Sequence, residues 1–116
     1  MPQYLVSGYL PDNFDPSTQD EAMVEEIHAL NREMIAAGVR KFAGGLGAAH
    51  TLRPQPNGEL LLTDGPYLET KEYIASFYLL DCESETRAHE IAADMPWADI
   101  NPTEVWPILH ESAADL

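Results

Sequence analysis

The side chain best suited to proton transfer near neutral pH is His28, because histidine alone titrates there without strong perturbation. Helical spacing places His28 at the edge of an apolar stripe that contains Met23, Ile27 and Leu30. A position at the edge of such a stripe can line a cleft, and it can equally face solvent. The sequence therefore offers His28 as a general acid or base, with a solvated surface histidine as the alternative.

Residues 64–73 hold a second set of side chains that can bind or react. Asp64 and Gly65 most simply shape a tight turn, since aspartate accepts local backbone hydrogen bonds and glycine relaxes φ. The other members, which combine alternating charge with aromatic rings, are Tyr67, Glu69, Lys71, Glu72 and Tyr73. Such a set can line a substrate-binding cleft in which Lys71 holds an anionic group. The alternative is an exposed, salt-bridged connection or a dimer contact.

Several other kinds of site are excluded or disfavoured by the sequence. The four histidines lack the short spacings typical of metal sites, so we expect no metal and no cofactor. Cys82 is the only cysteine, which rules out a disulfide within the chain and favours a small buried residue over a nucleophile. The glycines at 44, 45 and 47 are followed neither by Lys-Ser/Thr nor by a helix start, so they form no phosphate-binding loop.

The charge of the 116-residue chain, −14 at pH 7, excludes two classes of partner. Residues 59–116 carry thirteen acidic and two basic residues, a net charge of −11. Nucleic acids and anionic membranes both require clustered lysine and arginine, so we expect neither as a partner. The sequence also shows no secretory signal and no apolar run long enough to span a membrane. We therefore expect a cytoplasmic protein.

The elements that must position these side chains follow from hydrophobic periodicity and turn residues. The spacing of apolar residues predicts a helix that begins after an N-cap at Thr18 and ends at Gly38. A second helix is expected over residues 85–94, with Ser84 as its N-cap and Pro96 after its end. The predicted strands cover residues 4–10, 39–43, 50–53, 59–63, 75–81 and 103–109, and Asn57-Gly58 joins the third and fourth. Pro107 places the last strand at a sheet edge or a strand end.

This order of elements, β-α-β, a hairpin and β-α-β, predicts an α+β fold of the ferredoxin-like split βαβ type. Its antiparallel sheet would carry both helices on one face. A sheet covered on one face only should alternate apolar and polar residues, but residues 77–80 are continuously apolar. We therefore expect a second copy of the chain to cover the other face, giving a homodimer through the sheet.

The segment Asp64-Gly65-Pro66-Tyr67-Leu68-Glu69-Thr70-Lys71-Glu72 resembles the signature of the YCII-related proteins, specifically the DGPF subfamily. The resemblance extends to Gly44-Gly45-Leu46 upstream and to the closing Glu104-Val105-x-Pro107, and so covers nearly the whole chain. It implies a single domain over residues 1–112, followed by a tail at 113–116. It also implies a dimeric α/β-barrel fold without a cofactor, and acid–base catalysis by analogy with small isomerases of that fold.

Two departures from the family pattern bear on the site. Members of the wider group have a histidine in the first helix and an aspartate before a proline, and their matching positions here hold Ile27 and Met95. His28 and Asp94 stand one residue away, so a His28–Asp94 catalytic pair requires the two helices to lie side by side. Trp106 occupies the position of an arginine in the closing motif, which weakens the case for an anion-binding pocket there.

Two hypotheses about function follow. The first is a dimeric, cofactor-independent acid–base enzyme acting on a small acidic or lactone-like metabolite. In it, His28 and Asp94 would be catalytic, and Asp64, Tyr67, Glu69, Lys71 and Tyr73 would bind substrate. The second is a non-catalytic ligand-sensing or protein-interaction module, in which the acidic half of the chain faces a basic partner.

Overall fold

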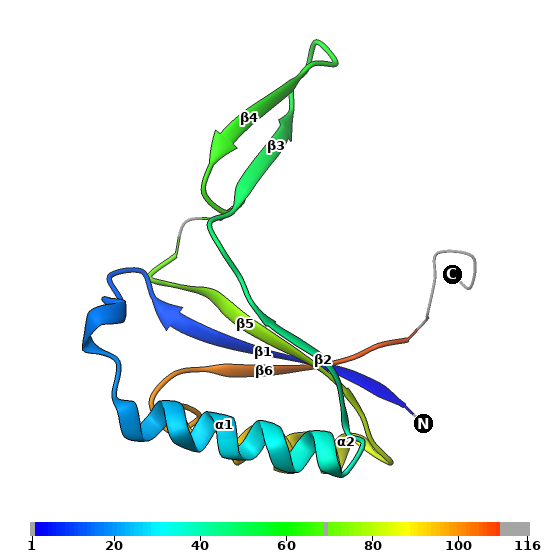
Figure 1. The fold of residues 1–116 in the computed structure, drawn as a ribbon. Coiled ribbons are helices and arrows are strands. Elements are labelled where there is room, and N and C mark those ends of the chain that lie inside the picture. The colour runs from blue at the N-terminus through cyan, green and yellow to red at the C-terminus, as the bar shows by residue number, and fades with distance from the viewer. Residues whose placement is uncertain (1, 69, 110–116) are drawn as a thin grey trace.

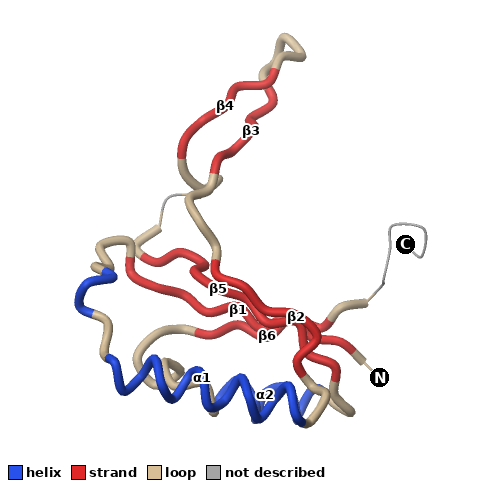
Figure 2. Tube along the Cα trace, in the orientation of Figure 1, coloured by secondary structure: helices blue, strands red, loops and turns tan. Residues whose placement is uncertain are grey.

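A computed structural model describes residues 2–68 and 70–109, in which the elements follow the predicted order (Figures 1 and 2). The elements are β1 (Gln3–Pro11), the short 3-10 helix η1 (Pro16–Thr18), α1 (Glu21–Ala36), β2 (Arg40–Gly45), β3 (His50–Pro54), β4 (Leu60–Asp64), β5 (Glu72–Asp81), α2 (Glu85–Ala93) and β6 (Thr103–Pro107). The predicted tail at 113–116 lies outside the described residues. In the described part of the chain, no helix combines the length and apolar character needed to cross a membrane.

The main sheet has four strands in the order β2-β5-β1-β6, and every neighbouring pair is antiparallel. Each βαβ unit therefore encloses a strand of the other unit, which confirms the split βαβ arrangement. Both helices lie on the same face of this sheet (Figure 1). β6 is an edge strand and ends at Pro107, as the proline predicted, because a residue without an N–H cannot donate to a further strand.

The first helix begins two residues later than the predicted cap implies. Asp20, not Thr18, is the N-cap, and its side chain accepts a hydrogen bond from the backbone N–H of Ala22. The Thr18 hydroxyl is already engaged, because it donates to the Asp15 carbonyl at 2.7 Å within η1. Gly38 ends the helix as predicted, with a φ of 72° that side chains other than glycine rarely adopt.

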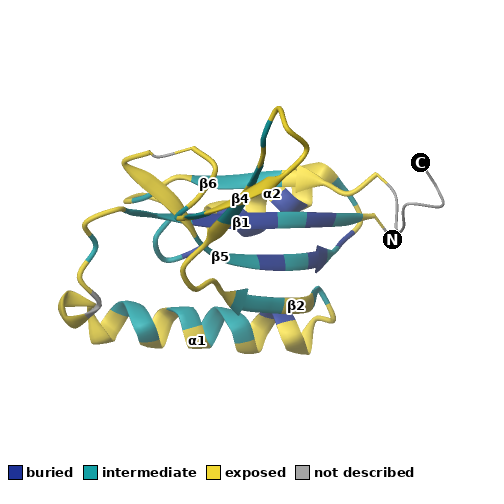
Figure 3. Cartoon of the chain, turned by 90° about the horizontal axis from the view of Figure 1, so that it is seen from above, coloured by how far each residue is buried: buried dark blue, intermediate teal, exposed yellow. Residues whose placement is uncertain are grey.

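The second helix confirms its predicted cap. The Ser84 hydroxyl accepts a hydrogen bond from the Arg87 backbone N–H at 3.1 Å. Asp94 is the C-cap residue, which places it at the turn after α2. Buried residues of both helices pack on the sheet around Val6, Tyr78 and Leu80 to form the core (Figure 3). Cys82 is 1% exposed, and burial raises the pKa of its thiol, which confirms the prediction of a small buried residue.

The opposite face of the sheet carries no helix and is also apolar. Phe42 and Trp106 are 59% and 53% exposed there, although each is a large hydrophobic side chain. Phe42 also contacts Phe77, and the two ring centroids are 5.7 Å apart. We name Leu5, Phe42, Phe77, Leu79 and Trp106 the open sheet face; pairing between strands places these side chains on the side away from the core.

The hairpin formed by β3 and β4 projects from the sheet on the side of the open sheet face, away from the helices (Figure 1). Its strands pair with each other from His50↔Asp64 to Pro54↔Leu60. Its turn uses Gly58 at a φ of 86°, as the Asn57-Gly58 sequence predicted. The hairpin root meets the sheet where β5 begins, and this junction contains the signature segment.

Candidate functional site

The beginning of the signature segment forms the turn that the sequence predicted. Gly65 has a φ of 94°, and its N–H donates to the Ala49 carbonyl at 2.9 Å. The Thr51 hydroxyl donates to the Gly65 carbonyl at 2.8 Å, which fixes the turn to β3. Asp64 is the last residue of β4, and its side chain is 98% exposed. Asp64 and Gly65 therefore shape the hairpin root, and Asp64 keeps a free surface for a ligand.

A cleft of about 1230 Å³ lies at this root, between the hairpin and the nearby ends of β1 and β5. We call it the signature cleft. Its polar side chains come from three parts of the chain, and they are Tyr9, Asp12, His50, Asp64, Thr70, Glu72 and Tyr73. Apolar lining comes from the residues between β2 and β3 and from Pro66 and Leu68. A mostly apolar cleft with a few polar groups of this kind is typical of small-molecule sites.

Tyr9 brings an acid–base pair to the wall of the signature cleft. Its hydroxyl donates a short hydrogen bond to Oε1 of Glu104 on β6. The hydrogen bond raises the pKa of Tyr9, and burial and the negative charge of Glu104 raise it further. Tyr9 is therefore a protonated donor held against a carboxylate, in a site that is partly shielded from water.

The register of the strands explains why these two residues meet. Ser7 pairs with Glu104 across β1 and β6, and Tyr9 lies two residues beyond Ser7 on the same face. Diagonal neighbours of this kind are about 7–8 Å apart between backbones, within reach of a tyrosine side chain. A bulge between Gly8 and Tyr9 shifts the pairing of β1 with β5, so that Tyr9 lies opposite Ile74.

A second pair crosses the root of the hairpin. His50 and Asp64 are partners in the pairing of β3 with β4, and Nε2 of His50 lies 3.4 Å from Oδ1 of Asp64. Both side chains are more than half exposed, so the ion pair by itself adds little stability. The position of the pair matters for chemistry, because it brings an imidazole and a carboxylate together at one wall of the signature cleft.

The comparison with protein families matches residues 3–112 to the YCII-related domain. This chain belongs to the YCII-related family. An uncharacterized protein of Rhizobium meliloti (strain 1021) is 36% identical over 88 residues, which cover 73% of this chain and 68% of that protein. The family resemblance inferred from the signature and the closing motif is thus confirmed.

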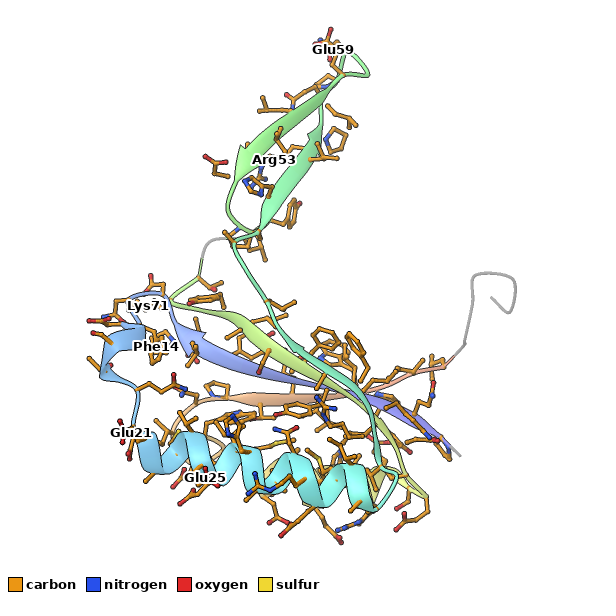
Figure 4. All side chains as sticks on the ribbon, viewed as in Figure 1. Phe14, Glu21, Glu25, Arg53, Glu59 and Lys71 are labelled. Carbon is orange, nitrogen blue, oxygen red and sulfur yellow. The ribbon has the colours of Figure 1, made fainter. Side chains whose placement is uncertain are left out.

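The predicted substrate-binding residues of this YCII-related protein do not share one site. Asp64 and Tyr73 line the signature cleft. Tyr67 instead lies beside Arg53 on the hairpin, with the guanidinium carbon 5.2 Å from its ring centroid, a cation–π distance. Lys71 lines an adjoining surface hollow, which shares Asp12 and Glu72 with the signature cleft. Lys71 lies away from Arg53 on the hairpin (Figure 4). Glu69 lies outside the described residues.

The predicted catalytic residues lie on the helix side of the molecule. His28 is exposed on α1, and Asp94 is exposed at the C-cap of α2. Among the described residues, no hydrogen bond or ion pair joins them, and neither lines one of the clefts described here. The positions that match the wider family's pair behave differently, since Met95 is buried in the core and Ile27 lines a second cleft.

This second cleft, of about 570 Å³, separates the N-terminal half of α1 from the sheet. Its walls are mainly apolar and aromatic, with Phe14, Met23, Tyr78 and Trp97 among them. Tyr78 and Trp97 stack with centroids 6.2 Å apart, and the Asn31 amide donates to the Tyr78 hydroxyl at 3.3 Å. Tyr9 lines this cleft as well, with Asp20 and Tyr78 as its other titratable side chains. The signature cleft adds a histidine and three carboxylates to Tyr9, so it is the better candidate for chemistry.

Sequence reasoning missed the two side chains that give the signature cleft its acid–base character. Tyr9 was assigned only to a strand, and His50 was considered only as a metal ligand. Glu104 did carry a signal, because it opens the closing motif Glu104-Val105-x-Pro107. In the described ranges 2–68 and 70–109, no group of three or more His, Cys, Asp or Glu residues could hold a metal ion.

Proposed function

We propose that this YCII-related protein is a homodimeric, cofactor-independent acid–base enzyme that binds a small metabolite in the signature cleft. The observation that carries the proposal is the Tyr9–Glu104 pair at the cleft wall, where a neutral phenol donates to a carboxylate. This arrangement is suited to a proton relay: the Tyr9 oxygen accepts a proton from the substrate while its own proton passes to Glu104. Such positioned proton transfer contributes roughly 10²–10⁴-fold to rate.

His50 completes the proposed reaction from the hairpin side. An isomerisation moves one proton away from a substrate atom and returns a proton to another, so it needs a second acid–base group. His50, held near Asp64, donates a proton to the second substrate atom. Glu104 then releases the proton it gained and His50 regains one by exchange with solvent, which restores both groups for the next turnover. In this proposal the two pairs divide the work, and no oxidant, metal or cofactor takes part.

The charge around the signature cleft bears on the class of substrate. Asp12, Asp64 and Glu72 line it, and His50 is its one basic side chain among the described lining residues. An anionic ligand would meet net repulsion there, because like charges oppose binding in a partly shielded site. Of the acidic and lactone-like metabolites that the sequence left open, we therefore propose the neutral class, a lactone or a related carbonyl compound.

The proposed dimer places two open sheet faces against each other. The support is the exposure of Phe42 and Trp106 in a patch that no element of the chain covers, among the described residues. Aromatic residues of this kind are enriched at the centres of interfaces. Such a dimer has the dimeric α/β-barrel arrangement that the family resemblance implied.

The alternative, a non-catalytic sensing or interaction module, is favoured by one observation. Residues 59–116 carry a net charge of −11, which suits an exposed surface for a basic partner. In this reading the signature cleft would bind a ligand without converting it. Exchange of ligand protons therefore separates the two hypotheses, because it requires acid–base catalysis and binding alone does not cause it.

The experiment is a thermal-shift screen of lactones, cyclic ketones and matched carboxylic acids, followed by proton NMR of each hit in D₂O. A ligand at about 100 times its Kd stabilises the fold by roughly 2.7 kcal/mol, which raises Tm by several degrees. We expect neutral carbonyl hits whose carbon-bound protons exchange with solvent only when protein is present. Binding without proton exchange would support the non-catalytic sensing module instead of the enzyme. Hits confined to anions would contradict the proposed ligand class.

A further inference from the structure

The hairpin carries an apolar surface on one of its two faces. Leu52, Leu60 and Leu62 are 61%, 64% and 62% exposed. Leu52 pairs directly with Leu62, and Leu60 lies two residues along β4, so all three side chains share one face. We call this surface the leucine face. The other face holds Thr51, Arg53, Leu61 and Thr63, a more polar set.

The hairpin does not belong to the core of its own chain. β3 and β4 form a separate two-stranded sheet, and among the described strands they pair only with each other. A lone two-stranded hairpin is marginally stable in water, and it gains independent stability when further strands or another surface cover its apolar side. The leucine face therefore needs a covering surface that the described part of this chain does not supply.

The exposed area of the chain is larger than a compact protein of its size would show. The accessible surface is 8233 Å². A compact monomer of 12.9 kDa exposes about 6300 Å². Over the 116 residues that both figures cover, the accessible surface thus exceeds the area of a compact monomer by about 1900 Å². A standard interface buries about 800 Å² on each partner, so the excess suffices for one interface.

A second copy of the chain fits this requirement better than an unrelated protein does. The hairpin rises on the same side of the sheet as the open sheet face, so the hairpin and the sheet form a corner (Figures 1 and 3). His50 and Asp64, which share the face of Leu52 and Leu62, line the signature cleft together with Tyr9 of the sheet. A twofold axis that brings two open sheet faces together places each chain in the corner between the hairpin and the sheet of the other chain. Each hairpin then lies beside the other chain, and the two contacts are equivalent by symmetry.

Charge also limits where two copies can meet. Each chain carries −14, so most surfaces of one copy repel the same surfaces of the other. The leucine face and the open sheet face are the surfaces on which large apolar side chains gather with few charges. Contact through these two surfaces buries apolar area, and two carboxylates that share them are already paired within their own chain, Asp64 with His50 and Glu104 with Tyr9.

We infer that the hairpin is an arm that packs its leucine face on the second copy. The signature cleft lies at the root of this arm, in the corner that the partner fills, and is fully enclosed only in the dimer. The inference rests on the proposed dimer and adds to it a second contact, which couples assembly to ligand binding.

The test is site-specific photo-cross-linking of the full chain, with p-benzoylphenylalanine in place of Leu62. The matched control carries the same residue in place of Leu61, which is on the opposite face of the same strand and is half exposed. We expect cross-linked dimers from position 62, with the attachment mapped to the other chain by isotope-mixed peptides, and none from position 61. Equal yields from both positions, attachment within the same chain, or no cross-link would overturn the inference.

A second measurement separates failure of the arm from failure of the dimer. Leu52→Ser with Leu62→Ser should weaken the dimer at least about thirtyfold, as expected for loss of a 2 kcal/mol contact, while Leu61→Ser should not. Sedimentation equilibrium measures both. A dimer that persists unchanged in the double variant refutes the arm and leaves the sheet interface intact. A wild-type chain that is monomeric refutes both the arm and the dimer, while the thermal-shift screen tests ligand binding in the signature cleft separately.

Discussion

The Tyr9 hydroxyl donates a hydrogen bond to Glu104, and this bond joins the first strand of the sheet to the last across 95 positions of sequence. It sits where β1 changes register, on the face that carries no helix. The bond has two roles in this account: it ties an edge strand to the sheet centre, and it holds a proton at the wall of the signature cleft. Each role makes a separate prediction.

Removing the Tyr9 hydroxyl should destabilise the fold. Tyr9→Phe keeps the ring but leaves the Glu104 carboxylate without its donor, which we expect to cost about 1–2 kcal/mol in the free energy of unfolding. Urea denaturation followed by circular dichroism measures this change. Tyr67→Phe is the control, since that ring is exposed on the hairpin, and it should stay within about 0.5 kcal/mol of wild type. Equal stability of both variants would show that the Tyr9–Glu104 bond is energetically neutral.

The same bond predicts how stability depends on alkaline pH. The pKa of Tyr9 in the folded protein is raised above its ordinary value of 10.0, first by the hydrogen bond to Glu104. Its contribution to stability is therefore fully present below pH 10 and is lost as pH rises through the folded pKa. Denaturation curves between about pH 8 and pH 12 should show a steeper loss for wild type than for Tyr9→Phe. Burial also raises the pKa of Tyr4, but that residue is present in both proteins and cancels in the comparison.

Gly8 should not tolerate a side chain. A Cβ at this position would lie 2.9 Å from Oγ of Ser76 and 3.1 Å from Nε1 of Trp97. Gly8→Ala should therefore cost about 1–3 kcal/mol through overpacking. Adding Ser76→Ala removes the nearer atom and should recover part of the loss. Gly47→Ala is the control, because no atom lies within 4 Å of its added Cβ, and thermal denaturation compares the set. A stable Gly8→Ala protein would mean that the indole and the serine can move aside.

The two histidine positions can be compared with a substrate from the screen. We expect His50→Ala to slow ligand proton exchange by about 10²–10⁴-fold, because it removes an acid–base group from the signature cleft. His28→Ala should leave both exchange and folding unchanged, since the His28 side chain is exposed on α1. Proton NMR in D₂O gives both rates. The opposite result would move the chemistry to α1 and support the sequence-based prediction for His28 and Asp94.

A charge on the open sheet face should dissociate the proposed dimer. Trp106→Glu places a carboxylate in an apolar patch where a copy of the same chain would bring another, so we expect a monomer by light scattering. Trp106→Phe keeps an apolar ring and should remain dimeric. If Trp106→Glu has the same mass as wild type, a second copy does not cover this face.

Short-range sequence patterns were sufficient to predict most of the fold. The helices began and ended near their predicted residues because apolar spacing, Ser84 and Gly38 act within a few positions of sequence. The Thr18 cap failed because its hydroxyl was taken by the preceding turn, a competition between two local bonds. The Tyr9–Glu104 pair could not be predicted, since it depends on the pairing of β1 with β6 and on a bulge.

The site was harder to predict than the fold for a related reason. Tyr67, Lys71 and Tyr73 are close in sequence, yet the chain leaves the hairpin between them and directs them to different surroundings. Of the proposed substrate-binding residues that the structure describes, only Asp64 and Tyr73 line the signature cleft. The alternation of charge therefore identified the right segment of the chain, but it did not show which of its side chains line the same cleft.

The two outer strands of the main sheet have a further consequence for how the protein behaves at high concentration. An uncovered strand edge offers N–H and C=O groups to any passing strand, which is how fibrils grow. β2 interrupts its own edge with a bulge at Lys41, and β6 ends in Pro107, which has no N–H to offer. Growth by adding strand to strand is thus hindered at both edges of the four-stranded sheet, which disfavours fibrils that start from this sheet.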